Sequence, residues 1–115
     1  MAKRQSDYIV VITPEAKEGL QQIIEYLEEE VSFLTAKNVR QAILDGLDTL
    51  INRPESHGYM TELNDGEIMY RRVLVLKGKY RIIYTIVETK TEVRVIDISR
   101  SGRGSEYMKE VKKRH

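Results

Sequence analysis

The sequence predicts an α+β domain in which an antiparallel helical hairpin packs on a mostly antiparallel β-sheet. Apolar residues recur at helical spacings of three and four between residues 14 and 53, whereas residues 70–99 are rich in β-branched side chains. The gaps between the β-rich segments are short enough for hairpins. Helices followed by strands are typical of α+β folds, and 115 residues suit a single domain over residues 1–115.

The first element is the β-branched run Tyr8-Ile9-Val10-Val11-Ile12, which predicts a short buried strand. Thr13 then suits a helix N-cap, and Pro14 suits the first helical position because its φ is already fixed. The helix that follows has one apolar stripe, formed by Ala16, Leu20, Ile23, Ile24, Leu27 and Val31.

A second helix begins after a cap at Ser32 or Thr35 and ends at Arg53-Pro54, because a residue before proline disfavours helical backbone. Its apolar stripe consists of Ala36, Val39, Ile43, Leu47 and Leu50. So short a connection predicts an antiparallel helical hairpin. Residues 53–68 are expected to form an irregular connection.

Three further strands are predicted at Tyr70–Leu76, Tyr80–Val87 and Glu92–Ser99, joined as a meander. Both faces of Tyr80–Val87 carry apolar side chains, so this strand should be central in the sheet. A short basic helix is predicted over Ser105–Arg114. The element order is therefore β-α-α-β-β-β with a terminal helix.

The composition narrows the class of protein. The chain has no cysteine and no apolar run of the roughly 20 residues that span a membrane, so we expect a cytoplasmic protein. No phosphate-binding glycine loop, zinc-binding His-Glu-x-x-His or nucleophilic serine elbow is present. His57 and His115 do not form a metal-ligand spacing, so we expect neither a metal nor a cofactor.

The net charge of +1 conceals a strong asymmetry. Residues 1–69 contain 6 Lys and Arg against 13 Asp and Glu, whereas residues 70–115 contain 13 against 5. A basic half that folds as one sheet concentrates positive potential and is typical of proteins with a phosphate-rich partner. An ordinary solvated face that offsets the acidic helices explains the composition equally well.

The candidate functional residues are cationic. Arginines lie on the second and third predicted strands, at Arg71, Arg72 and Arg81, and beyond the fourth, at Arg100 and Arg103. Neighbouring strands lie about 4.8 Å apart, so these guanidinium groups can converge on one phosphodiester. Tyr107 follows, where a phenol can activate a ribose hydroxyl or stack on a base. The structural alternative pairs Arg81 with a carboxylate and makes Tyr107 an anchor for the terminal helix.

Five segments together resemble the RelE/ParE toxin superfamily over nearly the whole chain. They are Ile12-Thr13-Pro14-Glu15-Ala16-Lys17, Ile23-Ile24-Glu25-Tyr26-Leu27, Tyr70-Arg71-Arg72-Val73, Gly78-Lys79-Tyr80-Arg81-Ile82-Ile83-Tyr84 and Val95-Ile96-Asp97-Ile98-Ser99-Arg100. The resemblance implies a toxin that a cognate antitoxin neutralises. RelE-like members cleave messenger RNA on the ribosome without a metal, whereas ParE-like members inhibit DNA gyrase. A toxin-like protein that has lost activity and acts only as a binding or co-repressor partner is a third possibility.

By position, the resemblance implies that Arg81 contacts the scissile phosphate and that Tyr107 is the catalytic tyrosine of a RelE-like ribonuclease. Arg100 or Arg103 would replace a family arginine, because Ser101 occupies its aligned position. The groups expected to hold the RNA backbone are Arg71, Arg72, Lys77 and Lys79. On these residues ribosome-dependent RNA cleavage is the leading expectation, and gyrase inhibition by binding is the alternative.

Overall fold

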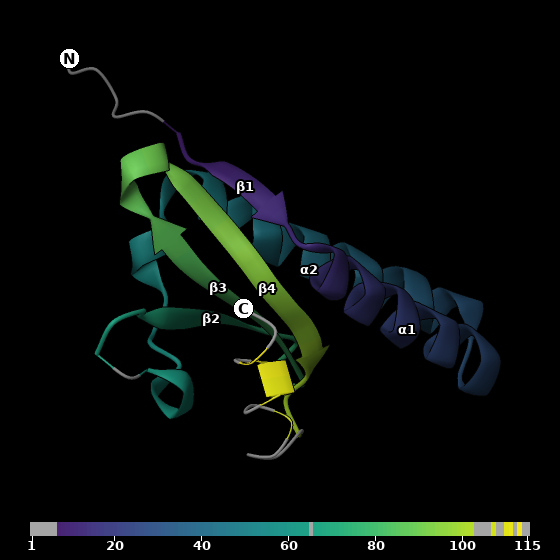
Figure 1. Ribbon diagram of the computed structural model, residues 1–115. Coiled ribbons are helices and arrows are strands. Elements are labelled where there is room, and N and C mark those ends of the chain that lie inside the picture. The colour runs from purple at the N-terminus through teal and green to yellow at the C-terminus, as the bar shows by residue number, and fades with distance from the viewer. Residues whose placement is uncertain (1–6, 65, 103–106, 108–109, 112, 114–115) are drawn as a thin grey trace.

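The computed structural model describes residues 7–64, 66–102, 107, 110, 111 and 113. It has two layers, with helices α1 (Pro14–Glu30) and α2 (Phe33–Asn52) against one face of a four-stranded sheet. Figure 1 shows that the helical hairpin runs beyond the end of the sheet, so its turn projects from the body of the molecule. The α+β architecture predicted from the sequence is confirmed.

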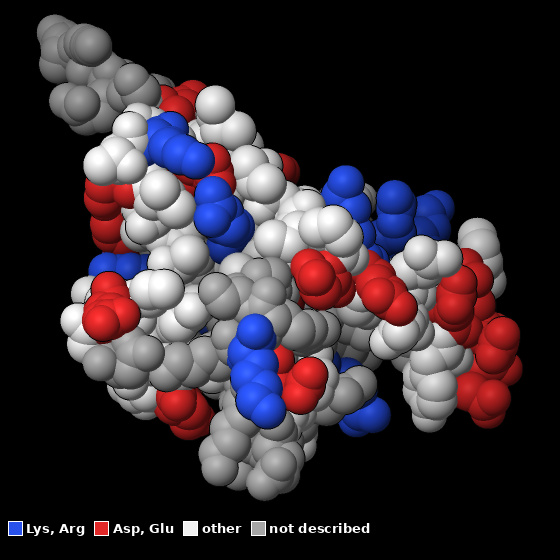
Figure 2. Space-filling model, viewed as in Figure 1, with Lys and Arg blue, Asp and Glu red and all other residues white. Residues whose placement is uncertain are grey.

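Local signals in the sequence set the helix ends. The Thr13 hydroxyl accepts a hydrogen bond from the Ala16 amide and so caps α1, and the Ser32 hydroxyl accepts one from the Thr35 amide and caps α2. Of the two predicted caps for α2, Ser32 is therefore the one used. The outer side of the hairpin is charged, and Figure 2 shows acidic side chains gathered at its projecting end.

The sheet has the strand order β1-β4-β3-β2. Strands β2 (Tyr70–Val75), β3 (Tyr80–Val87) and β4 (Glu92–Arg100) form the predicted antiparallel meander. Residues 80–84 of β3 are all buried, as expected of a central strand. A register shift between Ile83 and Tyr84 marks a β-bulge opposite them in β4, which changes the residues that β4 presents to each face.

Strand β1 (Ile9–Ile12) pairs parallel with β4 and forms one edge of the sheet. The prediction of a buried strand is wrong here, since the Ile9 side chain is 65% exposed and that of Val11 is 38% exposed. The helices cover only one face of the sheet, so an edge strand buries the side chains on that face alone.

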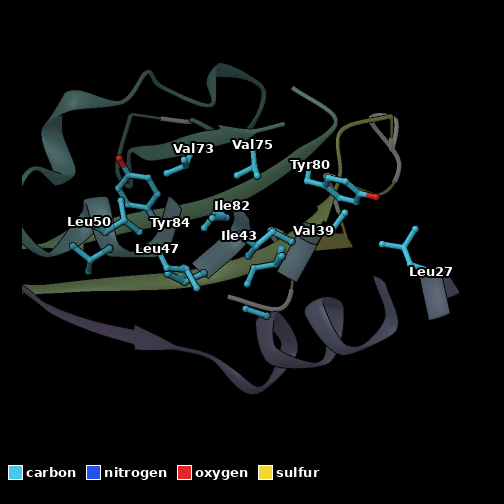
Figure 3. Packing of buried hydrophobic residues seen from close by; sticks show 14 of the residues in the cluster. Leu27, Val39, Ile43, Leu47, Leu50, Val73, Val75, Tyr80, Ile82 and Tyr84 are labelled. Atoms are coloured by element: carbon cyan, nitrogen blue, oxygen red, sulfur yellow. The ribbon is translucent and has the colours of Figure 1, made fainter. Parts of the chain in front are cut away.

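The main core lies between the helices and the sheet (Figure 3). From α2 it includes the predicted stripe Ala36, Val39, Ile43, Leu47 and Leu50, and from the central strand Tyr80, Ile82 and Tyr84. Helix α1 lies very close to β4 at Gly19, where an added Cβ would come within 2.3 Å of the Ile98 carbonyl oxygen. Only glycine permits this approach without moving the helix.

A second, smaller cluster covers part of the other sheet face. Met60 and Leu63 come from the 53–68 connection, which forms short 3₁₀ turns at Pro54–Ser56 and Thr61–Leu63. Val111 is fully buried in this cluster, and Tyr107 packs against it. Tyr107, Glu110, Val111 and Lys113 have helical backbone, and the rest of the predicted helix lies outside the described residues. Within the described part of the chain, no helix is long and apolar enough to cross a membrane.

Candidate functional site

The strand registers divide the candidate arginines between the two sheet faces. Arg81 lies opposite Ser99 of β4, and Arg72 lies opposite Ile83 of β3. Residues that lie directly opposite each other in an antiparallel sheet share a face. Arg72 and Arg81 therefore lie on the face that the helices leave uncovered.

Arg81 is almost fully buried, with 7% of its surface exposed. Its Nη1 atom donates a hydrogen bond of 3.2 Å to the carbonyl oxygen of Ser101. Burial lowers the pKa of the guanidinium from its usual value, and the negative charge of nearby Asp97 opposes that effect. The structure therefore surrounds Arg81 with protein groups, Asp97 among them.

Asp97 and Tyr107 form a short hydrogen bond beside Arg81. The Tyr107 hydroxyl donates to Asp97 Oδ1 at 2.6 Å, and only 1% of Asp97 is exposed. The β-bulge in β4 places Asp97 opposite Ile83 and so on the face of Arg81. Sequence reasoning did not single out Asp97, although a lone carboxylate within the apolar run Val-Ile-Asp-Ile signals a buried polar contact.

Arg72 is partly buried at the edge of this cluster. Its Nη1 atom donates to the carbonyl oxygen of Tyr59 at 3.0 Å, and its positive charge contributes to lowering the pKa of Arg81. It thereby holds the 53–68 connection against β2. Arg72, Arg81 and Tyr107 are the predicted site residues that the structure brings to one face.

Arg71 belongs to the opposite face, because it lies opposite Tyr84, a residue of the main core. Its guanidinium donates to the carbonyl oxygens of His57 at 2.6 Å and Glu55 at 3.1 Å, and to the Tyr59 hydroxyl at 3.0 Å. It also lies 4.2 Å from the centre of the Tyr59 ring, a cation–π distance. These contacts fasten the 53–68 connection, so Arg71 does not join Arg81.

The remaining predicted cations lie at one end of the sheet. Lys77 and Lys79 are exposed in the turn between β2 and β3, and Arg100 is exposed at the end of β4. Arg100 lies opposite Tyr80 and so on the helix side, away from Arg81. Arg103 lies outside the described residues.

A cavity of about 680 Å³ opens at this end of the sheet. Its lining comes from α1, the β2–β3 turn, the end of β4 and Tyr107, with Lys79 and Arg100 among the lining residues. No group of potential ligands suited to a metal ion occurs among the described residues. The site thus combines buried Arg81 and Asp97 on one face with a cationic cavity at the end of the sheet, and the partly buried Tyr107 contacts Asp97 and also lines that cavity.

Comparison with protein families matches residues 10–104 to the family described as ParE toxin of type II toxin-antitoxin system, parDE. A comparison with curated proteins finds no match.

Among solved structures, the chain resembles one from the chromosomal ParDE system of P. aeruginosa, with 14% identity and a TM-score of 0.66 over 81% of this chain and 95% of that one. It also resembles a mutant of the E. coli toxin RelE in the free state, with 17% identity and a TM-score of 0.59 over 93% and 97%. An archaeal RelE–RelB complex from Pyrococcus horikoshii OT3 gives 19% identity and a TM-score of 0.56 over 85% and 99%. At these identities the likeness shows a common fold.

Proposed function

Because the chain belongs to the family of ParE toxins of type II toxin–antitoxin systems, we propose that it stops growth by binding DNA gyrase rather than by cleaving messenger RNA. The observation that supports binding over cleavage is the environment of Arg81 and Tyr107. A group that stabilises the transition state must touch the reacting phosphate, and a general base must reach the proton it removes. Arg81 is 7% exposed, and the Tyr107 hydroxyl proton points to Asp97.

The separation of the other cations supports the same conclusion. Arg71 is held by Tyr59 and backbone carbonyls on the helix side, and Arg100 also lies on that side. A phosphate on the sheet face that the helices leave uncovered would contact Arg72. Among the described residues, no set of three guanidinium groups converges on such a phosphate. Inhibition by binding needs only a complementary surface.

A cognate antitoxin is the second partner in this proposal. The chromosomal ParDE system and the archaeal RelE–RelB complex among the similar structures are toxin–antitoxin pairs. The exposed cations Lys77, Lys79 and Arg100 favour an antitoxin with acidic residues in its toxin-binding segment.

A supercoiling assay with purified gyrase and relaxed plasmid tests the proposal. The wild-type chain should inhibit supercoiling, and Tyr107→Phe should inhibit it equally once circular dichroism shows a folded protein. Primer extension on a message translated in vitro should give no new RNA ends with either protein.

Two results would overturn this function. New RNA ends with wild type that disappear with Tyr107→Phe, together with unaffected supercoiling, would assign ribosome-dependent RNA cleavage instead. Failure of induced expression to slow growth in cells without the antitoxin would assign a binding or co-repressor role with no toxicity.

A further inference from the structure

The turn of the helical hairpin carries three exposed apolar side chains within four residues. Val31 is 58% exposed, Phe33 71% and Leu34 64%. Single exposed apolar residues are ordinary on protein surfaces, whereas a contiguous group marks an interaction surface. Figure 1 shows that this turn projects past the sheet, so no other described element covers it.

The same turn is acidic. Glu28, Glu29 and Glu30 are all exposed in the last turn of α1, and this turn contains no basic residue. Carboxylates at a helix C-terminus face the negative end of the helix dipole, so this arrangement disfavours the isolated helix. A partner with positive charge and apolar surface would relieve both the repulsion and the exposure. Residues 28–34 are called the hairpin tip below.

The chain itself carries a surface of that chemistry at the end of the sheet. The cavity there has cationic side chains, Lys79 and Arg100, beside apolar ones from α1, Tyr26 and Leu27. Tyr26 is 54% exposed, so an incoming side chain can reach this apolar wall. We call this surface the basic cavity.

Further cationic and apolar groups continue the basic cavity over the β2–β3 turn. Lys77 is exposed beside it, together with Leu76 at 43% exposure. No acidic residue occurs between residues 70 and 87, so nothing in these two strands neutralises the positive charge.

The two surfaces are neighbours in one molecule but cannot meet there. Tyr26 lines the basic cavity and the tip begins at Glu28 of the same helix, only about 3 Å further along a straight α-helix at 1.5 Å per residue. Two copies related by a two-fold axis avoid this restriction, because each tip can enter the other copy's cavity. The two contacts then lie side by side and form one continuous, self-complementary interface.

We propose that a second copy of this chain is the partner of the hairpin tip, with each tip docked into the basic cavity of the other copy. Phe33 and Leu34 meet the apolar wall at Tyr26 and Leu27. The carboxylates of the tip meet Lys79 and Arg100. The proposal is independent of the toxin's target, and the antitoxin would compete with the second copy for Lys79 and Arg100.

Sedimentation velocity of the isolated full chain over a range of concentrations tests the dimer, and a charge exchange tests its contacts. We compare Glu28→Lys/Glu29→Lys/Glu30→Lys with Lys79→Glu/Arg100→Glu. Each variant alone should weaken dimerisation about tenfold or more, because like charges then oppose each other in both contacts. An equimolar mixture of the two should restore the dimer, because one contact is then native and the other has both charges exchanged.

Phe33→Asp tests the apolar part of the tip without endangering the fold. Phe33 is the first residue of α2, where a carboxylate favours the helix dipole, so this variant should keep wild-type thermal stability while losing the dimer. Ile68→Asp is a matched control, since Ile68 is 43% exposed in the 53–68 connection and should leave the dimer intact. A wild-type monomer at every concentration, or a dimer unaffected by changes at the tip and the cavity, would overturn the proposal and leave the tip to a different partner.

Discussion

At the scale of single residues, the sequence predicted that Arg81 needs a partner but not which residue that partner is. An arginine in the middle of an apolar central strand requires a buried partner, and Asp97 and the Ser101 carbonyl supply its environment. The sequence could not identify Asp97 as that neighbour. A bulge in β4 places both Ile96 and Asp97 on the face of Arg81, whereas regular alternation would put them on opposite faces, so counting from either end of the strand gives different answers for Asp97.

Tyr107→Phe should lower the free energy of unfolding by about 1–3 kcal/mol, because the buried Asp97 carboxylate loses the hydroxyl that donates to it. Urea denaturation at pH 7 measures the change. Tyr26→Phe is the matched control, since Tyr26 is largely exposed and its change should be small. Equal stability of both variants with wild type would contradict a structural role for the Asp97–Tyr107 contact.

His57 gives the molecule a pH dependence near neutrality. Burial lowers its pKa below the usual 6.5, with a further contribution from the positive charge of Arg71. The unfolded chain then binds a proton more readily than the folded one. The contribution of neutral His57 to the free energy of unfolding is fully present above pH 6.5. It is lost as the pH falls below 6.5 and through the lower pKa that His57 has in the folded chain.

We therefore expect the melting temperature to fall between pH 7 and pH 5, and His57→Gln to reduce that fall. An NMR titration of the His57 ring should give a midpoint below 6.5. His115 is the only other histidine, so the variant His115→Gln leaves a single imidazole to follow. A midpoint at or above 6.5 would show that the ring is not shielded as described.

At the scale of elements, caps and periodicity predicted both helices and three strands closely, because those signals are local. Pro14 and Arg53-Pro54 mark the start of α1 and the end of α2 where the structure has them. Such local signals could not predict that β1 lies at the edge of the sheet. Its partner β4 lies far away in the sequence, and nothing in a four-residue strand tells an edge from a centre.

Gly19→Ala should lower the free energy of unfolding by about 2 kcal/mol, despite the better helix propensity of alanine, since its Cβ would lie 2.3 Å from the Ile98 carbonyl oxygen. Gly46→Ala is the matched control in α2. Its new Cβ would meet only side-chain carbon atoms at 3.2 Å and beyond, which can yield. Chemical denaturation of both variants should therefore give a clear loss for Gly19→Ala and a smaller change for Gly46→Ala.

The β2–β3 turn contains removable backbone strain. Leu76 and Lys77 have φ values of 54° and 57° and Gly78 has 85°, and the Lys79 amide donates to the Leu76 carbonyl at 3.2 Å, so Lys77 and Gly78 take the central positions of a type I′ turn. Lys77→Asn gives the Asn-Gly pair that such turns prefer and should raise the free energy of unfolding by about 1 kcal/mol. Lys79→Asn should give no such gain, and an equal effect of the two substitutions would indicate a surface-charge effect.

At the scale of the whole molecule, the RelE/ParE resemblance read from the sequence is confirmed by the family match over residues 10–104 and by the shared fold. The mode of action was harder to predict. A list of arginines does not reveal that Arg71 and Arg100 turn to the helix side, since that depends on register. Charge composition likewise predicted a basic half but not that Lys79 and Arg100 line one cavity while the strand arginines contact other parts of the chain.

Because the main core joins both helices to β2, β3 and β4, we expect the chain to unfold as one unit. Far-ultraviolet circular dichroism, which reports the helices, and tyrosine fluorescence should give the same midpoint in urea. Two separate midpoints would show that the hairpin melts independently of the sheet.

The pairing of β1 with β4 has a consequence for synthesis. Residues 13–91 separate the two strands, and a ribosome adds about 5–20 residues per second, so roughly 4–16 s pass between the emergence of the first strand and that of its partner. A nascent chain therefore cannot complete its sheet until β4 has left the ribosome. During that interval each new copy of the toxin is under synthesis without its complete fold.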